Sequence, residues 1–116
     1  MKRILLAENN SDLRSALALL LETRTQARIV AQACDLECLL REAAATQPDW
    51  IIADWDLLGN APAQTIHRLR EFAPLCKIIL TSARPELAEQ VYKAGADAFV
   101  CTIYPPETLL EAIPGS

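Results

Sequence analysis

Short apolar runs alternate along this chain with longer amphipathic segments. Five runs rich in Ile, Val, Leu and Ala lack the polar alternation of a half-exposed strand, which is typical of strands buried on both faces of a parallel sheet. We predict strands at 3–7, 28–33, 50–53, 77–81 and 98–101. Between them, apolar residues recur at helical spacing, so each intervening segment has one face that a sheet can cover. The clearest stripes are Leu13, Ala16, Leu17, Leu20 and Leu21 in the first helix, and Leu36, Leu39, Leu40 and Ala43 in the second.

Capping residues and prolines indicate where these helices begin and end. Asn10 or Ser11 is suited to cap the first helix and Asp35 the second. Prolines favour the first turn of a helix, and Gly95 suits the position after the end of the fourth. We therefore expect the third, fourth and fifth helices to begin near Pro62, Pro85 and Pro106, the fifth covering about 106–113.

This order predicts an α/β fold, a single-domain (βα)5 flavodoxin-like doubly wound parallel sheet. The right-handed crossovers of parallel strands place helices on both faces, and the strand order 2-1-3-4-5 is the natural choice. Ligands in such sheets lie beyond the carboxyl ends of the strands. That edge collects Glu8 and Asn9, Asp54, and Thr81 with Ser82.

Composition narrows the function classes. The chain has 116 residues, a net charge of −4 and a pI near 4.9, which describes one acidic domain over 1–116 without the basic surface of a nucleic-acid binder. Its apolar stretches are too short for a signal peptide or a membrane span. We expect a cytoplasmic protein that binds neither nucleic acid directly nor a membrane, with 114–116 as a terminal or linker stub. The sequence leaves open whether the chain is a fragment.

The cysteines and the single histidine give little support for metal or triad chemistry. The four cysteines are scattered through apolar segments, and only the first two are close in sequence: Cys34, Cys38, Cys76 and Cys101. Those two would share a helix face, but a structural zinc site takes about four ligands. We interpret all four cysteines as buried free thiols. His67 is expected in solvent on the outer side of a helix. Because it is the single histidine and has no suitable partner, a Ser-His-Asp triad has no support.

The polar cluster at the strand ends suits a hard cation and a phosphoryl group. Mg²⁺ takes oxygen ligands and often only one or two protein carboxylates, which Glu8 and Asp54 can supply together with the backbone carbonyl of Asp56. A carboxylate such as Asp54 can attack phosphorus to form an acyl phosphate. Thr81 would then donate a hydrogen bond to a phosphoryl oxygen. Glu8 could instead cap a helix or pair with a basic side chain.

Several segments, in order and spacing, resemble the response-regulator receiver domain of two-component systems. The resemblance extends from Lys2 to Ile113. It rests on the first strand with Glu8 and Asn9, on the segment leading to Asp54, on the strand ending at Thr81-Ser82, and on the stretch from Ala94 to Phe99.

The resemblance implies a signalling domain rather than an enzyme, with at most self-phosphorylation and slow autodephosphorylation. A histidine kinase or phosphotransfer protein would pass a phosphoryl group to Asp54 with the help of Mg²⁺. Thr81 and the switch residue Phe99 would relay the state to the face between the fourth and fifth helices. That face, which includes Val91, Tyr92, Phe99 and Tyr104, would bind an output partner or a second copy of the chain. The cognate kinase, the output and the oligomeric state are not encoded in these motifs.

The sequence departs from the family pattern at two important positions. The second acid after the first strand, the more direct metal ligand, is Asn9 here, so we expect weak Mg²⁺ binding. Thr102 stands at the lysine position, and no Lys or Arg follows Lys93. Loss of a preorganised charge costs a phosphoryl-transfer reaction about 3 kcal/mol, so phosphorylation is expected to be inefficient. Ile103 replaces the usual proline, so the bond before it is expected to be trans. Leu58, which stands where the family usually has a proline in the loop after the phosphoacceptor, is a milder departure.

Other functions remain open at this stage. Asn9 and Thr102 favour a phosphorylation-independent pseudo-receiver, a protein-interaction module that kept the fold. The Asp54-Trp55-Asp56 segment superficially matches the nucleophile motif of haloacid-dehalogenase-like phosphatases, although that motif normally sits on the first strand. A flavodoxin-like FMN carrier is also weakly supported, because the loop after the first strand lacks a glycine-rich phosphate cradle.

Overall fold

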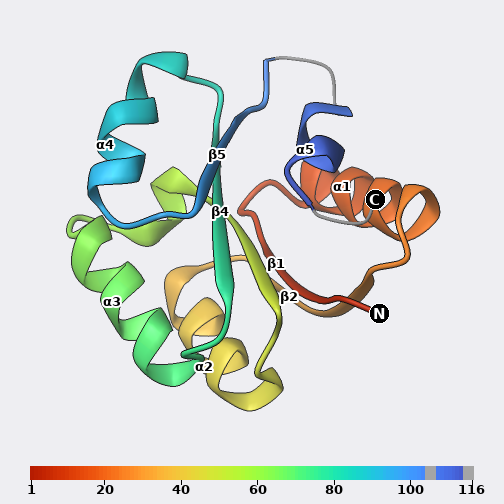
Figure 1. The fold of residues 1–116 in the computed structure, drawn as a ribbon, viewed down its shortest axis with the longest axis horizontal. Helices are drawn as coiled ribbons and strands as arrows, with labels where there is room; N and C mark the ends of the chain where they lie inside the picture. The colour runs from red at the N-terminus through yellow and green to blue at the C-terminus, as the bar shows by residue number, and fades with distance from the viewer. Residues whose placement is uncertain (104–106, 114–116) are drawn as a thin grey trace.

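The protein forms a five-stranded parallel sheet with helices on both faces. The computed structural model describes residues 1–103 and 107–113, and its sheet has the order β2-β1-β3-β4-β5 (Figure 1). The strands are β1 (Arg3–Ala7), β2 (Arg28–Ala33), β3 (Trp50–Asp54), β4 (Lys77–Ser82) and β5 (Ala98–Cys101). This confirms the predicted fold class and strand order. The predicted strands are also confirmed, β3 and β4 each continuing one residue further, to Asp54 and Ser82.

The helices form one layer on each face of the sheet. They are α1 (Ser11–Arg24), α2 (Leu36–Thr46), α3 (Pro62–Phe72), α4 (Ala88–Lys93) and α5 (Glu107–Glu111), with short 3₁₀ turns η1 (Trp55–Leu58) and η2 (Pro85–Leu87). Figure 1 shows α1 and α5 on one face of the sheet and α2, α3 and α4 on the other.

Alternate side chains of each strand enter the two layers, which is why the strand sequences are apolar throughout. Leu5 and Ile51 pack in the layer of α2, α3 and α4. Leu6 and Ile52, the next residue of each strand, pack in the layer of α1 and α5. The exposed fraction of each of these four residues is at most 1%, so the central strands have no solvent-exposed face.

The helix boundaries largely follow the predicted signals. Asp35 caps α2, its carboxylate accepting from the Cys38 N–H, and Pro62 begins α3. Pro85 begins η2 rather than α4, which starts at Ala88. Gly95 follows α4 with φ of 110°, a conformation that favours glycine. Pro106, like Tyr104 and the stub 114–116, lies outside the described residues.

The predicted apolar stripe of α1 is wrong at two of its five positions. Leu13 is 36% exposed and Ala16 is exposed, whereas Ala18 is buried together with Leu17 and Leu21. The helix packs against β1 and the edge strand β2. Because the sheet ends there, it covers only part of the apolar side of the helix.

The expectation of four buried thiols is also only half right. Cys76 and Cys101 are buried, but Cys38 is partly exposed and Cys34 is exposed. Cys34 follows β2 at the carboxyl end of the sheet, where the chain leaves the core before α2. His67 is exposed as expected and pairs with Glu71 at 3.4 Å.

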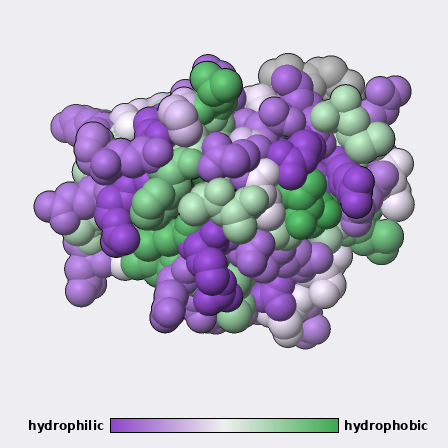
Figure 2. Space-filling view, turned by 90° about the horizontal axis from the view of Figure 1, so that it is seen from below, coloured by the Kyte–Doolittle hydropathy of each residue, from purple (hydrophilic) through white to green (hydrophobic). Residues whose placement is uncertain are grey.

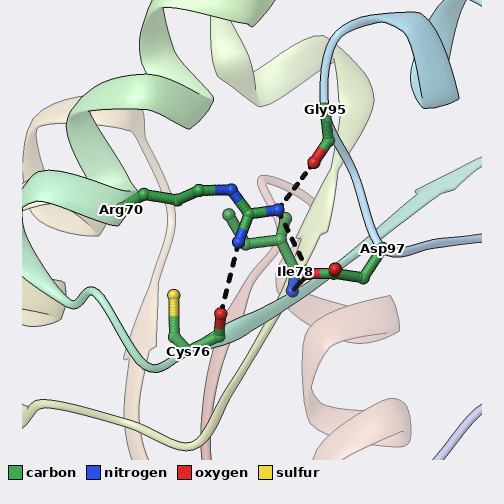
Figure 3. Close-up of polar contacts among 5 residues, drawn as sticks. All are labelled: Arg70, Cys76, Ile78, Gly95 and Asp97. Atoms are coloured by element: carbon green, nitrogen blue, oxygen red, sulfur yellow. Dashed lines mark hydrogen bonds and ion pairs between the residues drawn. The ribbon is translucent and has the colours of Figure 1, made fainter.

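Arg70 links the amino end of β4 to the turn before β5 (Figure 3). Its guanidinium donates to the backbone oxygen of Gly95 at 2.6 Å and to the Asp97 carboxylate at 3.1 Å. Asp97 also accepts from the Ile78 N–H at 2.8 Å and donates its own N–H to the Ile78 oxygen at 2.9 Å. These bonds fix the register with which β5 joins the sheet.

The face of the molecule seen from below is mixed in character. Figure 2 shows hydrophilic residues interspersed with smaller hydrophobic areas on the face seen from below. Among the described residues, no helix has both the length and the apolar character needed to cross a bilayer.

Candidate functional site

A pocket of about 410 Å³ opens at the carboxyl edge of the sheet, where the loops after β1, β2 and β3 meet. These three strands are neighbours, so the residues that follow them converge although they lie far apart in the sequence. The lining residues are Glu8, Asn9, Asn10, Cys34, Asp35, Leu36, Asp54, Asp56 and Leu57. The structure therefore brings together all four residues predicted to surround a metal ion: Glu8, Asn9, Asp54 and Asp56.

Glu8 is a buried residue of the pocket lining. Its side chain is only 7% exposed, and Oε2 accepts from the Asn10 N–H at 3.0 Å. Its backbone oxygen accepts from Arg14 at 2.7 Å. Asn10 itself caps α1, as predicted, by accepting from the Leu13 N–H. One Glu8 oxygen thus takes part in ordering the start of the helix.

Asp54, at the end of β3, is half-buried and electrostatically strained. Burial, reinforced by the negative charges of Glu8 and Asp56, raises the pKa of Asp54 to about 6. The backbone N–H of Asp56 and the charge of Arg84 act in the opposite direction. Two carboxylates that repel one another in a partly desolvated pocket are an arrangement that a cation would relieve.

The donor set fits a hard divalent cation that keeps several waters. Glu8 and Asp54 offer carboxylate oxygens and Asp56 a backbone carbonyl, the kind of ligands Mg²⁺ takes. Within 1–103 and 107–113, no three His, Cys, Asp or Glu side chains form a cluster able to hold a metal ion. The exposed Asn9 side chain donates through its amide nitrogen to the Cys34 backbone oxygen at 3.4 Å. That nitrogen therefore contacts the loop after β2.

Thr81 lies beside Asp54, its register partner in the neighbouring strand. Its hydroxyl is buried and is 3.5 Å from the backbone oxygen of Ala53, to which it donates. Phe99 on β5 is partly buried, and its N–H donates to the hydroxyl of Tyr92 on α4 at 3.2 Å. The hydroxyl and aromatic residues predicted as a relay therefore lie on adjacent strands.

Thr102, at the lysine position, follows β5 and is exposed. Its backbone N–H donates to the Ser82 oxygen at 2.9 Å, so the segment reaches the site edge without bringing a charge. The bond between Thr102 and Ile103 is trans, as predicted, since the described residues contain no cis peptide bond.

Arg84 was not anticipated as part of this site. It lies three residues beyond Thr81, and its Nη2 approaches Asp56 Oδ1 at 2.9 Å. The Asp35 side of the pocket was missed as well. Arg84 could have been predicted from its place in the sequence, because it is a basic residue just after a strand that ends at the ligand-binding edge.

Comparison with known proteins identifies the class to which this fold and site belong. The family model described as the response regulator receiver domain matches residues 4–114. The chain therefore belongs to the response-regulator receiver family of two-component systems, whose domains act in signalling.

Individual relatives agree with this assignment. The chain is 30% identical over 112 residues to the transcriptional activator protein ExaE of Pseudomonas putida, a match covering 95% of this chain and 52% of ExaE. It thus spans about half the length of that curated relative.

Two solved structures show the same fold. The receiver domain of the putative response regulator NarL from Mycobacterium tuberculosis has a TM-score of 0.83 at 21% identity, covering 96% of this chain and 91% of that one. A Burkholderia pseudomallei response regulator, described with a phosphorylated aspartic acid, a calcium ion and citrate, has a TM-score of 0.78 at 26% identity, covering 97% and 66%.

Proposed function

We propose that this receiver domain accepts a phosphoryl group on Asp54 from a histidine kinase or phosphotransfer protein. The observation that carries the proposal is the position of Asp54, a half-buried carboxylate at the end of β3 that faces Glu8 across an open pocket. The phosphorylated aspartic acid and calcium ion of the Burkholderia relative support the same chemistry. Asp54 is the last residue of the third strand rather than of the first, so the haloacid-dehalogenase interpretation gains no support.

The site residues divide the work. Glu8, Asp54 and the backbone carbonyl of Asp56 would hold Mg²⁺, with Asn9 at the edge of the same pocket. The cation would supply positive charge against the phosphoryl oxygens. Thr81, next to Asp54 on β4, would turn its hydroxyl from Ala53 to a phosphoryl oxygen. Phe99 and Tyr92 would transmit that movement to α4.

Binding of Mg²⁺ and phosphorylation are expected to be weak, for two reasons visible in the site. Asn9 contributes no charge, and Thr102 brings no ammonium group. These positions favour a second candidate, a pseudo-receiver that binds its partner without phosphorylation. In either case the face formed by α4, β5 and α5, on which Tyr92 is 53% exposed, is the proposed contact with an output partner or a second copy.

Trp55 provides a test, because it follows Asp54 directly and packs partly against the core. Its fluorescence is followed while Mg²⁺ and then beryllofluoride or acetyl phosphate are added, and intact mass is measured in parallel. We expect a saturable response, and a mass increase of one phosphoryl group that Asp54→Asn abolishes. No fluorescence change at millimolar Mg²⁺ together with no adduct would exclude phosphorylation and favour the pseudo-receiver.

The other tryptophan gives a matched control. Trp50 is 8% exposed and lies in the layer of α1 and α5, away from the pocket-lining residues. Trp50→Phe should therefore keep the fluorescence response, and Trp55→Phe should lose it while still forming the adduct.

A further inference from the structure

Two further carboxylates line the pocket of the proposed phosphoacceptor Asp54, and the lysine of the family pattern is missing. Glu8, Asp54 and Asp56 all line the pocket, and the phosphoryl group would add further negative charge. Thr102 is neutral, and only two basic residues occur beyond Thr81 in the sequence, Arg84 and Lys93. If the site is to have a side-chain cation in addition to Mg²⁺, that charge must come from a residue other than the one at position 102.

Arg84 is a basic side chain that the fold directs to the Asp56 side of this pocket. Its backbone N–H donates to the buried Ser82 hydroxyl at 3.1 Å, and its backbone oxygen accepts from Leu87 at 3.2 Å in η2. The residue is thereby anchored on both sides, immediately beyond the strand that carries Thr81. Its guanidinium crosses to the loop after β3 and contacts Asp56 at 2.9 Å, two residues from the proposed phosphoacceptor.

The partner that holds Arg84 can be exchanged easily. The side chains of Arg84 and Asp56 are 52% and 71% exposed, and an ion pair so exposed to water contributes little to stability. A guanidinium also has several N–H groups in a planar fork that suits phosphoryl oxygens. Moving from the carboxylate to a phosphoryl group would thus cost little and give a stronger partner.

We propose that Arg84 takes the place of the missing lysine and binds a phosphoryl oxygen on Asp54, leaving Asp56 to do so. This inference rests on the proposed function. In the transfer, an Asp54 oxygen bonds to phosphorus as the bond from phosphorus to the donor breaks. The leaving group, the histidine imidazole of a phosphohistidine donor or the acetate of acetyl phosphate, takes the electron pair of that bond, and Arg84 stays protonated throughout.

The test measures beryllofluoride affinity at fixed Mg²⁺ for the whole chain, with acetyl-phosphate labelling as a second readout. We expect Arg84→Ala to weaken binding by about tenfold or more, the effect of losing one hydrogen bond to a charged group. Arg84→Lys should fall between that variant and the wild type. Lys93→Ala is the matched control, because it removes one positive charge and an exposed ion pair of similar length, to Glu89 at 3.1 Å. It should bind like the wild type.

A second substitution distinguishes contact with the phosphoryl group from a role in holding the loop. Thr102→Lys in the Arg84→Ala background restores a cation at the family position without remaking the pair with Asp56, so it should recover most of the lost affinity. Failure of that rescue, or equal affinity of Arg84→Ala and the wild type, overturns the inference while the proposed function stands. Absence of any binding or adduct in the wild type overturns both.

Discussion

Asp54 carries a carboxylate whose surroundings favour its protonated form. Burial and two neighbouring acids raise its pKa from 3.8 to about 6, so near neutral pH the fold holds a charge that it disfavours. Such a group lowers stability above its folded pKa. The penalty declines as pH falls through about 6 and disappears below the unfolded value, where both states are protonated.

This predicts a pH-dependent effect of Asp54→Asn without metal. Each pKa unit corresponds to roughly 1.4 kcal/mol, and solvent screening at a half-exposed site reduces the sum. We expect the variant to be more stable than the wild type by about 1–2 kcal/mol at neutral pH, and the two to converge at pH 4. Urea unfolding in EDTA measures this.

Glu22→Gln, at an exposed position of α1, controls for the change in net charge. It should show no comparable gain at neutral pH. An Asp54→Asn variant whose advantage was constant between pH 4 and 8 would contradict the assigned environment of Asp54.

At the scale of elements, the junction of β4 and β5 depends on one carboxylate (Figure 3). Asp97 accepts from both the Ile78 N–H and Arg70, and Ile78 is fully buried. Asp97→Ala leaves that N–H without its acceptor, a loss of about 1–3 kcal/mol in the free energy of unfolding. Asp97→Asn keeps an oxygen in place and should lose less. Both values come from chemical denaturation.

The exposed pair of Glu89 and Lys93 on α4 offers the comparison. Glu89→Ala removes a carboxylate from an ion pair without a buried partner, so stability should stay within about 0.5 kcal/mol of the wild type. Equal losses for Asp97→Ala and Glu89→Ala would show that the bond to Ile78 contributes nothing beyond a surface ion pair.

The elements differ in how far the sequence predicted them. Buried parallel strands are continuous apolar runs, so β1, β2 and β5 were placed to the residue. The orientation of α1 was not, because its apolar residues cover more of the helix surface than the edge strand can bury. Glu8, Asp54 and Thr81 were brought to one edge by strand order alone. Arg84 was missed because its contact depends on a loop and a long side chain, neither of which has a periodic signal.

On the scale of the whole molecule, two adjacent strands connect the pocket with the α4 face. Asp54 is the register partner of Thr81 on β4, and the residue before Thr81, Leu80, pairs with Phe99 on β5. Phe99 in turn donates its N–H to Tyr92 of α4. These contacts form one continuous path, although a path becomes a coupling only when a change at one end shifts the other.

Thr81→Ala tests this coupling. In the wild type, we expect Mg²⁺ and beryllofluoride to shift amide NMR signals in the pocket and also in α4 and β5, because the hydroxyl leaves Ala53 for the bound group and the packing beside Phe99 follows. In Thr81→Ala, pocket signals should still move, with weaker affinity, while those of Tyr92 and Phe99 stay near their free positions. Ser82→Ala, which alters the neighbouring hydroxyl that anchors Arg84, should keep the distant shifts. Undiminished shifts at Phe99 in Thr81→Ala would show that the signal reaches α4 without Thr81.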